Sequence, residues 1–231
     1  MKIEILNWTK QPLSTIGTNA SYCYNTTLKD DEHRKRIGKS VIEDGHGRNL
    51  EFADVTLHIS GVSAKLVREF YTHIGGMPTR VQASTRYITY KDFGFVIPTG
   101  MTNEQQAVYE DIMRCIQDGY GKLKELNCNN DITGYTLPLS METEFIWKGN
   151  VRCLEHMFNQ RLCKRALTEY QDLMKLLKKQ LSELDEEWKW ISDNLFVPKC
   201  IKEGFCRESR CCGMMPKKEE VKRQLQLIKE I

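Results

Sequence analysis

A change of hydrophobic period between residues 50 and 70 constrains the fold more than any other feature of this sequence. In its first half, Val55, Leu57 and Ile59 alternate with polar residues, which is the period of a strand with one buried face. Directly afterwards, Ser63 is placed to cap a helix whose apolar side chains fall on one face. A strand that leads straight into a helix predicts a fold that mixes helices with a sheet.

The rest of the first half of the chain carries weaker signals. The N-terminal segment KIEILNW alternates and predicts a strand, whereas residues 9 to 30 are rich in Thr, Ser and Asn and are interpreted as a loop. Further on, the segment TRYITYKDFGFVIP has the β-branched and aromatic content of a strand. We therefore expect the ordered core to begin near Leu50, after an N-terminal strand and loop over residues 1 to 49.

Helical signals dominate the second half of the chain. Thr102 and Gln105 predict a capping box for a helix that runs to about Leu126. From Asn150 to about Leu181, apolar residues recur near helical spacing and predict the longest helix of the chain.

Residues 186 to 231 read as a charged tail, in which a final helix is expected from Lys217. The tail contains a group of cysteines: Cys200, Cys206, Cys211 and Cys212. Their spacing departs from the tight pairs of structural zinc sites, so we assign no metal, and unliganded thiols and an accessory site both remain open. Cys163, on the apolar side of the long helix, is interpreted as a core residue rather than a nucleophile.

Composition excludes several classes of partner. With 231 residues, of which 40% are hydrophobic, the chain can bury a substantial core. A formal net charge of only +3 gives no global field for a nucleic acid polymer, although local basic clusters can still bind a phosphate. No apolar run approaches the ~20 residues of a membrane span and no signal peptide is recognisable, so we expect a cytoplasmic protein without membrane contact. Nine cysteines, an odd number, favour reduced thiols.

Several common catalytic signatures are missing from the sequence. It contains no Walker A motif, no G-x-G-x-x-G turn after a strand, no H-E-x-x-H and no G-x-S-x-G. These absences argue against P-loop, Rossmann, zincin and α/β-hydrolase mechanisms. The chemistry must then rest on a less common arrangement of residues.

One segment, THIGGMPTRVQASTRYITY at residues 72 to 90, gathers side chains of the kind that bind anions. They are His73, Arg80, Gln82, Ser84 and Arg86. A second polar set begins the long helix and comprises Arg152, His156, Gln160 and Arg161. Taken singly, each residue has an ordinary alternative as a surface ion pair, a solvated turn residue, a polar helix face or, for His73, a satisfied residue at a helix C-terminus. Only their joint order points to a site.

That joint order resembles the flavin-dependent thymidylate synthases, the ThyX family. The segment LEFADVTLHISGVSAKLVREFYTH followed by QASTRY is similar to the family's E-H pair, strand, G-V-S-R-A, R-H-R and N-[EQ]-x-S-x-R-Y pattern. Further on, NVR and RLCKRA resemble its N-x-R and R-L-C-x-R-A-Q helix. The resemblance runs from about Leu50 to Gly213.

The resemblance implies a binding site for the substrate dUMP. Ser84 and Arg86 match the positions that hold its phosphate, and Gln82 matches the Glu or Gln beside them. Arg161 matches an Arg that also binds the nucleotide, and as a catalytic residue it would stabilise negative charge developing on the uracil. Two Arg from different elements can clamp a phosphate, because the guanidinium fork matches its oxygens.

The resemblance also implies FAD as the cofactor. His73 matches the His of R-H-R, while Asn150, Arg152 and His156 occupy positions that meet the flavin dinucleotide in the family. NADPH would reduce the flavin, and 5,10-methylenetetrahydrofolate would donate the one-carbon unit that converts dUMP to dTMP.

The chain departs from the family pattern at several positions. They are Phe52, Glu69, Thr72, Ile74 and Gly134, which replace a His, a Gln and three Arg. The spacer between His73 and Ser84 is longer than the commonest form and contains Arg80. We expect Arg80 to restore a cation lost at position 72 or 74, and we place it among the substrate-binding residues.

The resemblance finally implies an α+β fold of the ThyX type, with a central largely antiparallel sheet flanked by helices and a long C-terminal helical region. We expect a single domain over residues 1 to 231, with the core and both sites in residues 50 to 185. It also implies a homotetramer whose active sites combine several subunits. Two other functions stay open: a related flavoenzyme that modifies another pyrimidine nucleotide, and a non-catalytic nucleotide- or flavin-binding relative.

Overall fold

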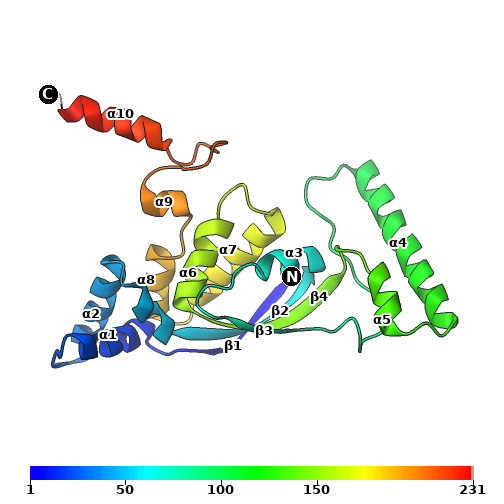
Figure 1. Cartoon of the computed structure of the whole chain (residues 1–231), viewed down its shortest axis with the longest axis horizontal. Helices are drawn as coiled ribbons and strands as arrows, with labels where there is room; N and C mark the ends of the chain where they lie inside the picture. The colour runs from blue at the N-terminus through cyan, green and yellow to red at the C-terminus, as the bar shows by residue number, and fades with distance from the viewer. Residues whose placement is uncertain (230–231) are drawn as a thin grey trace. The chain divides into compact units, whose positions relative to one another are not determined.

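The computed structural model describes residues 1–229 and combines helices with a four-stranded sheet of order β1-β2-β4-β3 (Figure 1). The strands are β1 (Lys2–Trp8), β2 (Asp54–Ser63), β3 (Thr79–Gln82) and β4 (Glu142–Asn150). β1 pairs with β2, and β3 with β4, in antiparallel orientation. The expected α+β class with a largely antiparallel sheet is therefore confirmed.

Helices occur along the whole described chain. They are α1 (Pro12–Cys23), α2 (Asp31–Glu43), α3 (Ala64–Phe70), α4 (Asn103–Glu125), α5 (Asn130–Thr133), α6 (Val151–Arg161), α7 (Thr168–Ser182), α8 (Glu186–Asn194), α9 (Lys199–Glu203) and α10 (Lys218–Lys229), with 3₁₀ turns η1 (Gly47–Phe52) and η2 (Gly134–Thr136). The expected final helix is α10. Within the described residues, no helix has both the length and the apolar character needed to cross a bilayer.

The chain divides into two compact units. The first contains Met1–Trp8 and Val55–Gly149, and the second contains Thr9–Asp54 and the residues from Asn150 onward. Both units combine segments that lie far apart in the sequence, and each has buried apolar side chains of its own. A single domain over the whole chain stays a prediction.

The first unit is built on the alternating strands β2 and β4. Leu57 and Ile59 on β2 and Phe145 and Trp147 on β4 are buried, whereas the residues between them are more exposed. From α3, the ring of Phe70 meets those of Phe145 and Trp147 edge-on, with centroids 5.0 and 5.8 Å away. The strand period that the sequence predicts here is confirmed.

Side-chain caps confirm the two helix starts expected in this unit. Where β2 ends, Oγ of Ser63 accepts a hydrogen bond from the backbone N–H of Leu66 at 3.0 Å and begins α3. At the start of α4, Thr102 and Gln105 exchange the two reciprocal bonds of a capping box.

In the second unit, α1 and α2 approach closely enough for their backbones to touch. A Cβ added to Gly17 would lie 2.0 Å from the carbonyl oxygen of Arg34, and one added to Gly38 would lie 2.1 Å from that of Leu13. No side chain fits at such distances, so each helix presents a glycine to the backbone of the other. This approach helps to bury Leu13 and Ile16 of α1.

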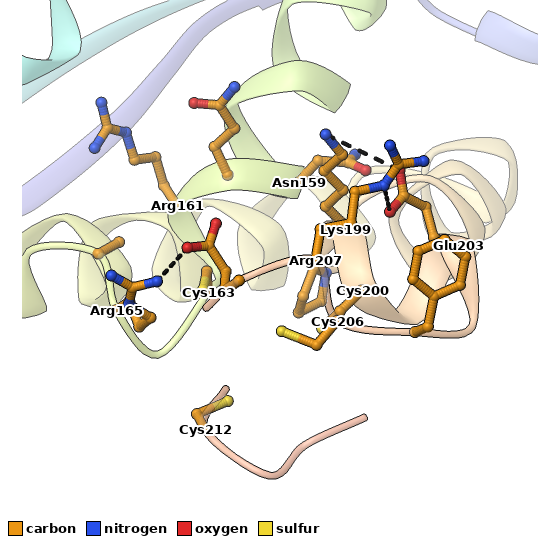
Figure 2. A pocket seen from close by; sticks show the side chains of 15 residues that line it. Asn159, Arg161, Cys163, Arg165, Lys199, Cys200, Glu203, Cys206, Arg207 and Cys212 are labelled. Carbon is orange, nitrogen blue, oxygen red and sulfur yellow. Dashed lines mark hydrogen bonds and ion pairs between the residues drawn. The ribbon is translucent and has the colours of Figure 1, made fainter. Parts of the chain in front are cut away.

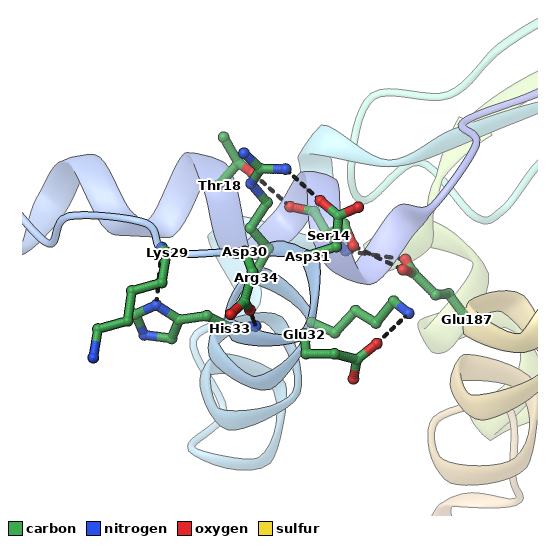
Figure 3. Close-up of polar contacts among 10 residues, drawn as sticks. Ser14, Thr18, Lys29, Asp30, Asp31, Glu32, His33, Arg34 and Glu187 are labelled. Carbon is green, nitrogen blue, oxygen red and sulfur yellow. Dashed lines mark hydrogen bonds and ion pairs between the residues drawn. The ribbon is translucent and has the colours of Figure 1, made fainter.

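Hydrogen bonds join α1 to α8 in the same unit (Figure 3). Glu187 on α8 accepts hydrogen bonds from the backbone N–H of Ser14 at 3.0 Å and from its hydroxyl at 2.7 Å. Because Ser14 lies in the first turn of α1, the buried carboxylate satisfies a donor that the helix itself leaves unpaired. The indole N–H of Trp188 donates to the carbonyl of Thr9 at 2.9 Å. α8 therefore belongs to the core of this unit, and the tail expected from residue 186 begins only after it.

The loop expected over residues 9 to 30 is wrong, because α1 forms there. Its polar side chains bond to carbonyls one turn earlier: Thr18 Oγ1 donates to Ser14 at 2.7 Å, and Asn19 Nδ2 donates to Thr15 at 3.0 Å. Packing against α2 and α8 outweighs the modest helix propensity of this composition.

The strand expected over TRYITYKDFGFVIP is also wrong. The segment contains an isolated bridge but no continuous strand, and β3 precedes it. Side chains of α4 bind its backbone instead: the Tyr120 hydroxyl accepts from the N–H of Tyr90 at 3.1 Å, and Gln117 donates to the carbonyl of Phe93 at 2.7 Å. These two backbone groups are therefore satisfied without a full strand ladder.

The long helix expected from Asn150 to Leu181 is interrupted. α6 ends at Arg161 and α7 begins at Thr168. Cys163 lies in the turn between them, and not on the apolar side of a helix as expected. Neither Gly nor Pro marks this break, which explains why the hydrophobic pattern alone did not predict it.

We predict that Gly38→Ala destabilises the protein by about 1–3 kcal/mol, because a methyl group must push the α1 backbone away. Gly119→Ala on α4 is the matched control, since a Cβ there meets nothing within 4 Å. That control should be neutral or stabilising by up to about 1 kcal/mol through helix propensity. Urea denaturation measures both, and unchanged stability in Gly38→Ala would contradict the backbone contact.

Candidate functional site

Tyr71 holds two of the predicted side chains of the first unit in place. The guanidinium of Arg80 lies over its ring, 3.7 Å from the centroid, and the Tyr71 hydroxyl donates to Oε1 of Gln82 at 2.9 Å. Gln82 in turn donates to Oγ1 of Thr143 on β4 at 3.4 Å. Burial raises the pKa of Tyr71, and the Arg80 cation opposes that effect. Arg80 and Gln82 are thus joined through one aromatic side chain.

Ser84 and Arg86 lie in the turn that follows β3. Oγ of Ser84 accepts a hydrogen bond from the backbone N–H of Arg86 at 3.1 Å, and its carbonyl accepts one from Ile88 at 3.2 Å. Nε of Arg86 donates to Oδ1 of Asp131 at 2.6 Å, and the two side chains are 65% and 55% exposed. The hydrogen bond to Asp131 raises the pKa of Arg86. This guanidinium therefore already binds an anionic group at the protein surface.

A pocket of ≈ 400 Å³ lies beside this ion pair. Its lining consists of Thr85, Arg86, Asp131, Gly134 and Tyr135. Gly134 stands where the ThyX pattern has an Arg, and a Cβ there would lie 3.4 Å from the carbonyl oxygen of Thr85. The departure at Gly134 therefore lines the same pocket as Arg86.

The altered segment after α3 is a turn that contains a buried histidine. His73 is only 3% exposed, whereas the neighbouring Ile74 is 72% exposed. Gly76 and Met77 follow with φ of 81° and 54°, so two consecutive residues adopt the left-handed conformation. The turn thus places His73 in the interior of the unit, and its role toward a cofactor stays a prediction.

In the second unit, Asn150 and Arg152 lie at the start of α6. Asn150 caps the helix, because its Oδ1 accepts a hydrogen bond from the N–H of Cys153 at 3.0 Å. Arg152 donates from Nη1 to Oε1 of Glu51 at 2.5 Å. Both predicted residues therefore have a structural contact in addition to any ligand contact.

His156 continues the same face of α6. Arg152, His156 and Gln160 are spaced by one helical turn each, and all three are exposed. Nε2 of His156 lies 3.2 Å from Nε2 of Gln160. These side chains form a polar stripe, the α6 stripe, with a cation at its N-terminal end.

Arg161 ends α6 and is half-buried. Its guanidinium lies over the ring of Tyr170 on α7, 4.9 Å from the centroid. It lines a pocket of ≈ 440 Å³ whose walls include further cations, two carboxylates and several thiols (Figure 2). We call this the cysteine pocket; its charged lining residues besides Arg161 are Arg165, Lys199, Glu203, Arg207 and Glu208.

The predicted residues thus fall into two sets. The first unit contains His73, Arg80, Gln82, Ser84 and Arg86, and the second contains Asn150, Arg152, His156 and Arg161. Three partners were missed by sequence reasoning: Glu51, Tyr71 and Asp131. A signal existed for Glu51, which is the Glu of the E-H pair, whereas nothing local distinguishes the other two.

A turn with an exposed Arg that pairs with a carboxylate, together with a polar helix face on an α+β fold, is an arrangement suited to phosphorylated ligands. A family model described as "Thymidylate synthase complementing protein", Thy1, matches residues 4–185. The chain belongs to this family. The matched range includes every predicted site residue.

Individual relatives agree with that assignment. A protein of Nitratidesulfovibrio vulgaris named "Flavin-dependent thymidylate synthase" is 25% identical over 247 residues, covering 95% of this chain and 97% of the relative. One of the same name from Pyrococcus furiosus is 26% identical and covers 90% of each chain. The crystal structure of ThyX from Helicobacter pylori with FAD and dUMP has a TM-score of 0.70 at 20% identity, covering 85% of this chain and 99% of that one. The similarity to the Helicobacter pylori structure shows that the two chains share a fold.

A double-mutant cycle tests the packing of Arg80 on Tyr71. Arg80→Ala and Tyr71→Leu should each destabilise the protein, and the double variant should fall short of their sum by about 0.5–1 kcal/mol, the value of such a contact. Tyr71→Phe is the control that keeps the ring and removes the bond to Gln82, so its coupling with Arg80→Ala should remain. Additive effects in urea denaturation would contradict the contact.

Proposed function

We propose that this chain catalyses the reductive methylation of dUMP to dTMP, with FAD as cofactor and with 5,10-methylenetetrahydrofolate and NADPH as co-substrates. The observation that carries the proposal is the exposed pair of Arg86 with Asp131 beside the pocket that Gly134 lines. Family membership supports the reaction class. The Arg86–Asp131 pair supports a binding site for the nucleotide phosphate at Arg86.

The phosphate of dUMP would take the place that Asp131 now holds at Arg86. An ion pair between two mostly exposed side chains contributes little free energy, so a ligand can displace it easily. A phosphate with its higher charge forms stronger bidentate hydrogen bonds to the same guanidinium. Ser84 and Gln82, on the same turn and strand, would add a hydroxyl and an amide to the nucleotide contacts.

The α6 stripe is proposed to hold FAD. Its guanidinium, imidazole and amide groups fit an anionic dinucleotide, because they can donate hydrogen bonds to pyrophosphate oxygens. Asn150, Arg152 and His156 would bind the cofactor there. His73, a buried residue of the first unit, is proposed separately as an FAD-binding residue. Bound FAD would supply the hydride chemistry that amino-acid side chains lack.

Arg161 is proposed as the catalytic cation that stabilises negative charge developing on the uracil ring. Tyr170 supports this role, since stacking limits the rotation of the guanidinium before substrate arrives. A preoriented cation costs less reorganisation in the transition state than a mobile one.

Arg80 is proposed to replace a cation that the chain lacks at Thr72 or Ile74. Its stacking partner Tyr71 directly precedes Thr72, which supports the idea that the charge is retained near the altered segment. Arg80→Ala should then weaken binding of both flavin and nucleotide, and unchanged affinities would contradict the replacement.

A homotetramer acting in the cytoplasm is part of the same proposal. Six apolar side chains of the first unit are at least 72% exposed: Ile74, Met77, Val81, Tyr87, Leu126 and Tyr135. Surfaces of this kind are commonly covered by a partner subunit. Light scattering of the purified protein measures the subunit number.

Steady-state dTMP formation with three variants tests the phosphate site. Arg86→Ala should raise the KM for dUMP roughly tenfold or more, because a charge-assisted contact to the phosphate is lost. Asp131→Asn should leave that KM unchanged or lower it, because the competing carboxylate charge is removed. Arg114→Ala is the matched control, since this exposed α4 residue of the same unit pairs only with its helix neighbours Glu110 and Asp111 in the contacts described.

Two outcomes would contradict the proposed function. Turnover of another pyrimidine nucleotide with dUMP inactive would favour the related flavoenzyme, which the Gly134 departure beside Arg86 makes the second candidate. Nucleotide binding without any turnover would favour a non-catalytic relative.

A further inference from the structure

The loop after α9 brings two cysteines together by closing on itself. The backbone N–H of Cys206 donates to the carbonyl of Pro216 at 2.7 Å, and Cys206 forms a parallel bridge with Lys217. Cys211 lies between these two ends. The loop is therefore tied at its base, which restricts where the Cys211 side chain can go.

The closed loop brings the thiols of Cys206 and Cys211 close together, because Cys206 bonds to Pro216 and Sγ of Cys211 bonds to the carbonyl of the preceding residue, Met215. The Cys211 thiol accordingly contributes to the raised pKa of Cys206. Sγ of Cys211 also accepts from the N–H of Gly213 and donates to the carbonyl of Met215, each at 3.3 Å. Cys206 is 8% exposed, whereas Cys211 is half-exposed. Cys211 is thus the thiol that a reagent can reach more easily, and Cys206 is the more buried of the two.

The ionisation of Cys206 fits this arrangement. The backbone hydrogen bond from Glu208 lowers the pKa of its thiol, but burial and the adjacent Cys211 thiol outweigh that effect and raise it. A thiol with a raised pKa supplies little thiolate, so Cys206 is suited to react second.

We propose that Cys206 and Cys211 form a reversible disulfide, a redox-sensitive site outside the proposed nucleotide and flavin residues. The proposal rests on the contacts of this loop alone and stands whether or not the chain is a thymidylate synthase. The oxidant would be a low-molecular-weight disulfide such as glutathione disulfide.

The exchange proceeds in two balanced steps. The Cys211 thiolate attacks one sulfur of glutathione disulfide, which breaks that S–S bond, forms a mixed disulfide and releases one glutathione thiolate. The Cys206 thiolate then attacks the Cys211 sulfur, forms the protein disulfide and releases the second glutathione. Two electrons pass from the two cysteines to glutathione, and the two protons lost from the cysteines are taken up by the released thiolates.

Closing this disulfide would fix the segment that carries Glu208. Glu208 forms an ion pair with Arg165, from the turn that follows α6, and both residues line the cysteine pocket. Oxidation would therefore make one wall of that pocket more rigid. Reduction would return its mobility.

Other cysteine pairings near this loop are less favoured. Burial raises the pKa of Cys200, and the nearby Cys163 and Cys212 thiols raise it further, so Cys200 has thiol neighbours of its own. Cys206 and Cys211 differ because one closed loop holds both of them. In the part of the chain that the structure describes, no three His, Cys, Asp or Glu side chains are arranged to hold a metal ion. The pocket therefore favours a dithiol over a metal centre.

Peptide mapping of the full-length protein tests the proposal. Protein equilibrated in glutathione buffers of increasing oxidised fraction is quenched in acid, alkylated and digested with trypsin. The expected product is a cross-link between the peptides EGFCR and CCGMMPK, formed with loss of two of the nine thiols and reversed by reduced glutathione.

Two variants distinguish Cys211 from Cys212, because both cysteines lie in the same tryptic peptide. Cys211→Ser should abolish the cross-link, whereas the matched control Cys212→Ser should retain it at wild-type yield. Far-UV circular dichroism checks that each variant is folded. The Cys212→Ser protein is decisive even if the other variant fails to fold, because Cys211 is then the one cysteine left in its tryptic peptide.

Three results would overturn the proposal. A cross-link that survives in Cys211→Ser and disappears in Cys212→Ser would show that Cys206 pairs with Cys212 and not with Cys211. A disulfide between Cys163 and Cys200 that forms at a lower fraction of oxidised glutathione than the Cys206–Cys211 bond would make that pair the redox-sensitive site. Thiols that become reactive only after treatment with a zinc chelator would identify a bound thiophilic metal instead.

Discussion

The candidate site depends on two positions at which a central strand ends in a helix cap. β2 ends at Ser63 and β4 ends at Asn150, and each side chain accepts a backbone hydrogen bond at 3.0 Å from the first turn of the next helix. Such caps fix where a helix begins and in which direction its first turn leaves the strand. The chain after α3 continues into the segment from His73 to Arg86, and α6 carries the polar stripe. Asn150 therefore has a structural role as the cap of α6, whether or not a ligand is bound.

Two cations of the predicted site share one physical property, which is a carboxylate partner that is at least partly exposed. Arg86 pairs with Asp131 in the first unit, and Arg152 pairs with Glu51 in the second. Pairs of this kind restrain a guanidinium without contributing much to stability, because water screens both charges. A cation held this way keeps its charge and remains able to exchange its carboxylate for a phosphate. Arg80 and Arg161 each lie over an aromatic ring, which restrains the orientation of the guanidinium.

Features set by neighbouring residues could be predicted from the sequence, and features set by distant residues could not. The alternation of β2, the Ser63 cap and the capping box at Thr102 depend on a few adjacent side chains, and all are confirmed. Helix α1 was missed because packing against α2 and α8 stabilises it. Asp131 lies far along the chain from Arg86, so no local pattern connects them.

Family resemblance predicted which residues form the candidate site, but it could not predict their contacts. The order of Gln82, Ser84 and Arg86 pointed to an anion-binding turn, and the structure adds the pocket beside it. Tyr71 carries no family signature, and only the fold shows that it joins Arg80 to Gln82. The interruption between α6 and α7 likewise depends on tertiary packing, which periodicity does not report.

The visible absorption spectrum of the purified protein tests the central claim most directly, with FAD added first and dUMP second. The account predicts that the protein retains or binds FAD and that dUMP then shifts the flavin bands, because the proposed reaction transfers a hydride from the flavin to the nucleotide. A folded protein that neither retains nor rebinds FAD would contradict the account. It would show that the changes at Phe52, Thr72 and Ile74 have removed the cofactor site.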